Sequence, residues 1–168
     1  MSRAFVKEPD GDEVADGQPE LPISPHPNYV RPQGLAKLKD RLAKLQQQRC
    51  VLAADPDDLL KRTPLAQAQR EIRYLEARIE RAIPIEPNGQ PAGRVAFGAT
   101  VEVVDEDEQV RRFTIVGEDE ADPTAGLVSW VSPLARALQD AEVGDLILWE
   151  RPMGDLELEV RAIGYDSA

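Results

Sequence analysis

The sequence is poor in the residues that most catalytic and metal sites require. Its 168 residues include one cysteine, Cys50, and one histidine, His26. A single cysteine excludes an internal disulfide and a cysteine-based zinc site. A single histidine in a proline-rich stretch argues against a histidine-centred catalytic triad or a multi-histidine metal site. These absences remove the commonest hydrolytic and zinc chemistries.

Long apolar runs and glycine-rich nucleotide motifs are also missing. No apolar stretch approaches the ~20 residues that span a bilayer, and the first 31 residues lack the apolar core of a secretory signal. Neither GxxxxGK[ST] nor GxGxxG occurs. We therefore expect a cytoplasmic protein without membrane contacts.

Charge is distributed unevenly along the chain, whose net charge is −11. Residues 1–33 carry three basic and six acidic side chains, residues 34–83 eleven and seven, and residues 84–168 six and eighteen. Such a polarised chain orients in the field of a charged partner, and its acidic part is repelled by bare nucleic acid. Solvated helices rich in Lys and Arg would explain the basic segment equally well without a partner.

Proline content and hydrophobic spacing define the N-terminal half. Residues 1–33 contain six prolines, which predicts a mostly disordered arm. In residues 34–83 apolar residues recur at spacings of three and four, the pattern of a coiled-coil seam. Two helical arms of equal length, 35–54 and 64–83, joined by a short turn, predict an antiparallel hairpin.

The turn of this hairpin is acidic. Asp55-Pro56 and Thr63-Pro64 each have the pattern of an N-cap followed by proline at the first helical position. Alignment of the two apolar series centres the turn on residues 58–59. The candidate site residues at the tip are three acids: Asp55, Asp57 and Asp58.

The C-terminal half has a different period. Proline and glycine in residues 84–94 predict a linker, and residues 95–168 then alternate polar and apolar positions. Ser132-Pro133 predicts the start of a short helix at 134–139. Together these features predict an α+β fold in which the hairpin precedes a mostly antiparallel sheet. The five predicted strands are 100–105, 110–116, 127–131, 146–150 and 156–163.

Two acidic clusters are candidates for chemistry. Carboxylates such as those of the tip bind Mg²⁺, which commonly takes one or two of them alongside waters and phosphates. Aspartate is also frequent in turns and at helix starts for purely structural reasons. The second cluster, residues 118–120 with Asp122, lacks the spacing of a calcium loop and is interpreted as a solvated or partner-facing loop.

Four motifs in the C-terminal half resemble the bacterial Gre (GreA/GreB) transcript-cleavage factors. They are FGATV at 97–101, IVGEDEAD at 115–122, SPLARAL at 132–138 and VGD at 143–145. The resemblance implies a coiled coil that enters the secondary channel of RNA polymerase and a C-terminal domain of FKBP-like fold that docks on the channel rim. It also implies acids at the tip that help to hold the second Mg²⁺ of the polymerase, which then hydrolyses backtracked RNA.

Further contacts with the polymerase and its RNA are expected outside the tip acids. The resemblance implies that Ser132, Pro133 and Arg136 contact the polymerase rim. Near the tip, Arg49, Lys61 and Arg62 are candidates for contacts with phosphates of the nascent RNA. On this reading the chain is a monomer and not itself an enzyme. It has no cofactor of its own and depends on the Mg²⁺ of the polymerase.

The tip departs from the family pattern, which reads approximately Gly-Asp-Leu-x-Glu-Asn. With Asp58-Leu59 placed on Asp-Leu, Lys61 stands where the glutamate belongs, and each arm is about one heptad shorter, or ~10 Å. Three functions stay open: a cleavage-stimulating channel factor, a cleavage-inactive channel binder that competes with other factors, and an FKBP-like prolyl isomerase. An isomerase needs an aromatic-lined pocket. The aromatics available for one are Phe97, Phe113, Trp130, Trp149 and Tyr165.

Overall fold

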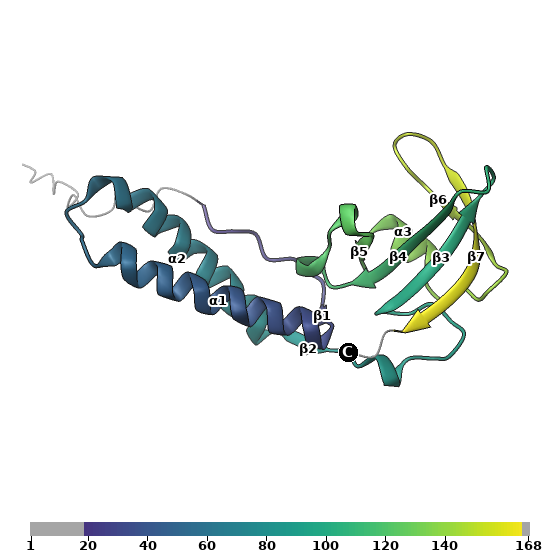
Figure 1. Ribbon diagram of the computed structural model, residues 1–168, viewed down its shortest axis with the longest axis horizontal. Coiled ribbons are helices and arrows are strands. Elements are labelled where there is room, and N and C mark those ends of the chain that lie inside the picture. Colours follow the sequence, from purple (N-terminus) through teal and green to yellow (C-terminus); the bar gives the residue numbers. More distant parts are fainter. Residues whose placement is uncertain (1–18, 166–168) are drawn as a thin grey trace, which may run out of the picture.

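A long helical hairpin is joined to a small sheet domain in the computed structural model of the chain, which describes residues 19–165 (Figure 1). The predicted arm therefore lies largely outside the described residues. In chain order the elements are β1 (Asn28–Val30), α1 (Pro32–Ala53), α2 (Leu59–Glu80), β2 (Ala82–Pro84), η1 (Pro87–Gly89), β3 (Ala99–Asp105), β4 (Val110–Val116), η2 (Glu118–Glu120), η3 (Pro123–Ala125), β5 (Leu127–Ser129), α3 (Pro133–Leu138), β6 (Leu146–Trp149) and β7 (Leu156–Tyr165).

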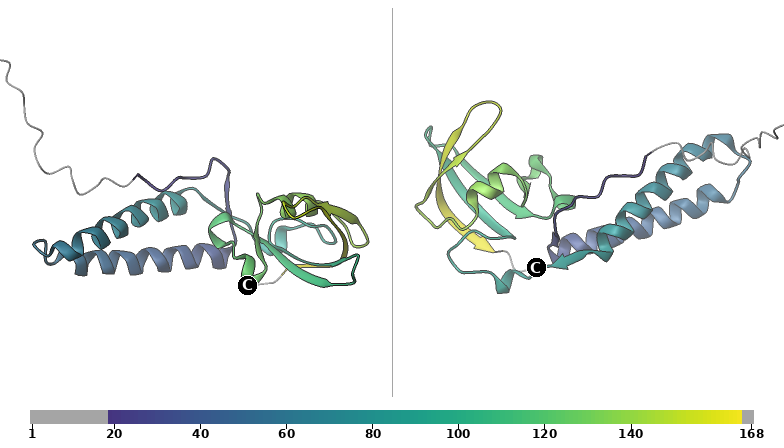
Figure 2. Two further views of the ribbon diagram at one scale, coloured as in Figure 1. Left: turned by 90° about the horizontal axis from the view of Figure 1, so that it is seen from above. Right: turned by 180° about the vertical axis from the view of Figure 1, so that it is seen from behind.

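The hairpin has the predicted antiparallel arrangement. Helices α1 and α2 are 22 residues each and lie side by side in all views (Figures 1 and 2). At 1.5 Å per residue each helix spans ~33 Å. The predicted apolar seam is buried where Ala68, Ile72 and Leu75 of α2 meet the first helix. The apolar face of each helix therefore packs against the other helix, as in a coiled coil.

The turn differs from the prediction. Neither Asp55-Pro56 nor Thr63-Pro64 starts a helix, because Asp58 caps α2 by accepting a hydrogen bond from the Leu60 N–H at 3.0 Å. Pro64 lies inside α2, near its start, where the missing N–H removes a single intrahelical bond. The predicted arm 64–83 is thus wrong at both ends, and the turn at residues 54–58 is centred on residue 56 rather than on 58–59.

The C-terminal domain is a curled five-stranded sheet in the order β5-β4-β3-β7-β6, antiparallel except for the parallel pair β4–β5. The strand 110–116 agrees with the prediction, and the other four differ by one or two residues at an end. Helix α3 lies on the sheet and closes the core through Leu134, Ala135 and Leu138. The predicted cap is confirmed, since the Ser132 hydroxyl accepts a hydrogen bond from the Ala135 N–H at 3.2 Å.

One element of the hairpin base was not predicted. Strand β1 pairs in parallel with β2, with Asn28 opposite Ala82 and Val30 opposite Pro84. The final residues of the predicted disordered arm are therefore part of the fold, and Asn28 and Val30 are buried. Three-residue strands are too short to produce a hydrophobic period, so sequence patterns miss them. Within residues 19–165 no helix has the length and apolar character needed to cross a membrane.

At Gly117 the loop after β4 lies against the backbone of β1. A Cβ at this position would lie 2.5 Å from the Tyr29 carbonyl oxygen of β1. We expect Gly117→Ala to destabilise the protein by about 1–3 kcal/mol in urea unfolding, since backbone must shift to make room. Gly89→Ala is the matched control, because nothing lies within 4 Å of its Cβ position. Equal losses for the two variants would contradict the proposed contact.

Candidate functional site: tip, docking helix and junction

The three predicted acids meet at the distal end of the hairpin, together with a lysine. Asp55 and Asp57 are exposed and Asp58 is half-buried. The Lys61 ammonium lies 3.4 Å from a carboxylate oxygen of Asp55 and 3.4 Å from one of Asp58. Two of the acids are thus partly neutralised within the tip, whereas Asp57 lies outside this ion-pair group.

The tip is not a ready-made metal site. Among residues 19–165, no group of three or more His, Cys, Asp or Glu side chains is arranged to hold a metal ion. The carboxylates of the tip would therefore contribute to a metal only in combination with ligands from another molecule. Of the predicted RNA-contacting residues, Arg49 and Arg62 are exposed near the tip, while Lys61 is engaged with the acids.

The predicted docking residues lie at the start of α3. The Ser132 hydroxyl is used as the helix cap, so its role in the free protein is structural. Pro133 and Arg136 are exposed on the outer side of the helix, whose leucines face the core. Pro133 and Arg136 are therefore the members of this set available to a partner.

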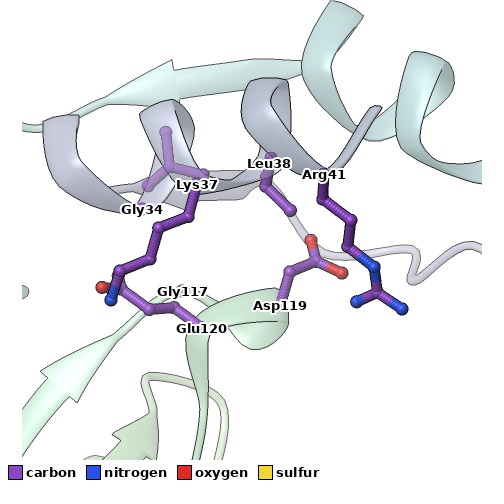
Figure 3. A pocket seen from close by; sticks show the side chains of 8 residues that line it. Gly34, Lys37, Leu38, Arg41, Gly117, Asp119 and Glu120 are labelled. Carbon is purple, nitrogen blue, oxygen red and sulfur yellow. The ribbon is translucent and has the colours of Figure 1, made fainter. Parts of the chain in front are cut away.

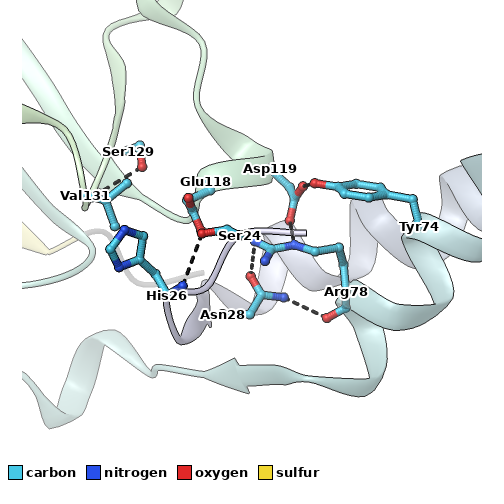
Figure 4. Close-up of polar contacts among 9 residues, drawn as sticks. All are labelled: Ser24, His26, Asn28, Tyr74, Arg78, Glu118, Asp119, Ser129 and Val131. Carbon is cyan, nitrogen blue, oxygen red and sulfur yellow. Dashed lines mark hydrogen bonds and ion pairs between the residues drawn. The ribbon is translucent and has the colours of Figure 1, made fainter. Parts of the chain in front are cut away.

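The main site that sequence reasoning missed is the junction between the hairpin base and the loop after β4. It joins four residues of the hairpin side, Asn28, Arg31, Tyr74 and Arg78, to Glu118, Asp119 and Glu120 of η2. Figure 4 shows the part of the junction around Arg78. The interpretation of residues 118–120 as a solvated or partner-facing loop is wrong. These carboxylates face the chain's own helices.

Arg78 is the centre of the junction and is only 2% exposed. Its Nε donates to Asp119 at 2.5 Å, and its Nη2 donates to the Asn28 side-chain oxygen at 2.6 Å. The Asn28 amide in turn donates to the Arg78 carbonyl at 2.7 Å (Figure 4). A second acid, Glu118, lies 3.5 Å from the guanidinium. Because these groups pair with the buried guanidinium, it avoids the large desolvation penalty of an isolated buried charge.

Tyr74 extends the same network along α2. Its hydroxyl donates to the second oxygen of Asp119 at 2.5 Å. Burial, followed by the hydrogen bond to the Asp119 carboxylate, raises the pKa of Tyr74 to about 12. The phenol therefore stays protonated over the whole neutral range and remains a hydrogen-bond donor to Asp119.

A second ion pair holds the start of α1. Arg31 donates to the Glu120 carboxylate through Nε at 3.1 Å and Nη2 at 2.5 Å. This carboxylate also lies against the first turn of α1, where a Cβ on Gly34 would be 2.6 Å from its oxygen. Gly34 thus leaves room for the Glu120 carboxylate, whose negative charge lies favourably near the helix N-terminus.

A small cavity of about 110 Å³ lies beside these contacts (Figure 3). Lys37 and Arg41 of α1 line one side and Asp119 and Glu120 line the other. Gly34 and Gly117 also line the cavity. Its mixed charges belong to the junction and do not define a separate anion or cation site.

The fold and this site define a class of two-part protein, in which a helical hairpin is fixed at its base to a small sheet domain. The family described as "Transcription elongation factor, GreA/GreB, C-term" matches residues 90–165. A GreB transcription elongation factor of Neisseria meningitidis serogroup B is 33% identical over 153 residues, which cover 82% of this chain and 94% of that protein. GreA of Alkalilimnicola ehrlichii is 37% identical over 148 residues, covering 79% and 94%.

The chain therefore belongs to the GreA/GreB family of transcription elongation factors, which confirms the resemblance found in the sequence. Among solved structures, GreA/GreB of Nitrosomonas europaea is 22% identical, covers 82% of this chain and 99% of its own, and has a TM-score of 0.41. Gfh1 of Thermus thermophilus is 24% identical, with coverages of 83% and 99% and a TM-score of 0.40.

We expect the removal of Arg78 to destabilise the folded protein. Arg78→Met leaves Asp119 without its buried partner, and we expect a loss of about 3 kcal/mol in the free energy of unfolding. The control is Arg112→Met, because Arg112 forms an exposed ion pair with Glu102 at 3.1 Å worth less than about 1 kcal/mol. Comparable losses in urea titrations would contradict a central role for Arg78.

The raised pKa of Tyr74 predicts that the stability of the protein depends on pH in the alkaline range. The folded pKa of about 12 exceeds the ordinary value of 10.0, so the unfolded chain loses this proton first. Stability must then fall as the pH rises through this window. We expect Tyr74→Phe to be less stable than wild type at pH 8 and the difference to shrink by pH 11.5. A difference that stays constant with pH would refute the assignment.

Proposed function

We propose that the protein binds RNA polymerase by inserting the hairpin into the secondary channel while the C-terminal domain docks on the channel rim. The observation that carries this proposal is the junction centred on Arg78. It fixes the hairpin relative to the sheet domain, so that docking of the domain determines where the tip lies. Membership in the GreA/GreB family and the exposed Pro133 and Arg136 on α3 support it.

The tip suits the active centre of a polymerase because it adds acids to a site that holds its own metal ions. In two-metal hydrolysis a second Mg²⁺ activates the attacking water, and one or two extra carboxylates are enough to hold it. Asp57 is the acid best placed for this role, since it is exposed and is not paired with Lys61.

A second candidate function is that of a channel occupant that does not stimulate cleavage. Lys61 favours it, because its ammonium partly neutralises Asp55 and Asp58 and repels a cation at the same place. We propose that the protein stimulates cleavage only weakly and that Lys61 sets this limit.

The aromatic side chains do not support an isomerase. Tyr29 packs against Phe97 at 6.0 Å and Trp130 at 4.9 Å between ring centroids, and Phe113 packs against Trp149 at 6.0 Å. Four of the five rings considered for a proline pocket are therefore packed against other rings, and the Tyr165 hydroxyl donates to the Arg94 carbonyl at 2.5 Å.

Cleavage of RNA in a backtracked complex of the cognate polymerase tests these proposals. We expect Lys61→Ala to stimulate cleavage several-fold more than wild type, because a positive charge is removed from beside the tip acids. Asp57→Ala should abolish stimulation, as should the combined replacement of Asp55, Asp57 and Asp58 by alanine. Binding is measured for each variant, with Glu76→Ala on the shaft of α2 as a control for charge.

The outcomes separate the two functions. If wild type and Lys61→Ala both bind and neither accelerates cleavage, the protein is a channel occupant that acts by competition. If Asp57→Ala cleaves as well as wild type, the tip acids do not serve the polymerase metal. Failure of every variant to bind would refute the proposed function as a whole.

A further inference from the structure

Residues 19–27, here called the N-terminal segment, run alongside α2 and reach the corner of the sheet domain (Figures 1 and 2). They precede β1 and contribute neither to the hairpin seam nor to the core of the sheet. Their polar contacts with the rest of the protein therefore indicate which surface they cover.

Two arginines of α2 hold one end of the N-terminal segment. Arg73 donates to the Glu20 carboxylate through Nε at 3.0 Å and Nη2 at 2.6 Å, and Arg70 donates to the Pro19 carbonyl at 3.2 Å. The hydrogen bond from Arg73 lowers the pKa of Glu20. The Arg70 Nε is buried without a hydrogen-bond partner among the described residues, so the N-terminal segment satisfies only part of this arginine pair.

The other end of the N-terminal segment meets the docking region. The His26 ring lies edge-on to Trp130, with 5.9 Å between centroids, and Figure 4 shows it beside Val131. Ser132 and Pro133 follow directly in the chain. The N-terminal segment thus lies next to both surfaces that the proposed function uses, the shaft of the hairpin and the start of α3.

The N-terminal segment is held loosely. Each of its nine residues is exposed or half-buried, and the side chains of Glu20 and Arg73 are 62% and 44% exposed. Exposed ion pairs contribute at most about 1 kcal/mol. A partner that offers equivalent groups can therefore displace the segment without unfolding the hairpin.

We propose that Arg70 and Arg73 form a binding face for carboxylate groups of the polymerase, and that the N-terminal segment occupies this face as an internal competitor in the free protein. This inference rests on the proposed function. Guanidinium groups bind carboxylates in a bidentate manner, and Glu20 provides one such ligand. The face accommodates a carboxylate and a main-chain carbonyl of an extended peptide, which are groups of a protein partner.

Equilibrium binding of the full chain to core polymerase without nucleic acid tests this proposal. We expect Glu20→Gln to bind about threefold more tightly than wild type, since an exposed ion pair no longer competes. The matched control Glu76→Gln removes the same charge from an exposed position of α2 and should leave the affinity nearly unchanged. In the Glu20→Gln background, Arg73→Gln should abolish the gain and bind more weakly than wild type.

A second measurement follows the N-terminal segment itself. Spin labels on the native Cys50 and on Ile23→Cys should give a narrow distance distribution in the free protein. The distribution should broaden in the Glu20→Gln variant and when polymerase is added to the labelled wild type. An unchanged distribution on binding would show that the segment is not displaced and would overturn the proposal.

The remaining outcomes are distinct. Equal affinities of wild type and Glu20→Gln would overturn the proposal that the N-terminal segment competes with the polymerase. Weaker binding of Glu20→Gln would also overturn it, because the segment would then be part of the docking surface. A gain confined to elongation complexes that carry RNA would assign the face to phosphates instead of carboxylates. If wild type and all variants fail to bind, the proposed function is refuted, and the proposed competition by the N-terminal segment is refuted with it.

Discussion

The buried ion pair between Arg78 and Asp119 is the interaction on which the arrangement of the molecule depends. An arginine that is 2% exposed is tolerable only when its donors are satisfied. Asp119 comes from the sheet domain and Asn28 from the strand at the hairpin base, so Arg78 binds both bodies at once. Any rotation of the hairpin relative to the sheet would leave at least one of these groups buried and unpaired.

The other contacts of the junction follow from this constraint. With Asp119 held against α2, the neighbouring Glu120 reaches Arg31 at the start of α1. Gly34 leaves room for the Glu120 carboxylate, and Gly117 lets the loop after β4 approach the backbone of β1. The two helices are thus attached to the same short loop at their base. A rod fixed at its base carries its tip to a defined place relative to the sheet domain, which a flexible attachment would not do.

The sequence predicts most of the fold but little of the junction. The seam of the hairpin, the five strands and the Ser132 cap all follow from periods and local caps, and the structure confirms them. The predicted start of α2 is wrong because Asp58 caps the helix, and not Thr63, which precedes a proline. The role of residues 118–120 was missed because it depends on a long-range contact. The available signal was Arg78 itself, a charge only three residues from Leu75 of the apolar seam.

Crosslinking from the native Cys50 to the polymerase would show whether the junction around Arg78 fixes the position of the hairpin tip. This cysteine is the only one in the chain, and it is exposed one turn before the end of α1. With a thiol-linked photoreactive group, we expect crosslinks to polymerase residues around the catalytic Mg²⁺, and their loss or scatter in Arg78→Met despite retained binding. Crosslinks confined to the outer surface of the polymerase would contradict insertion of the hairpin, and an unchanged pattern in Arg78→Met would contradict a junction that fixes its tip.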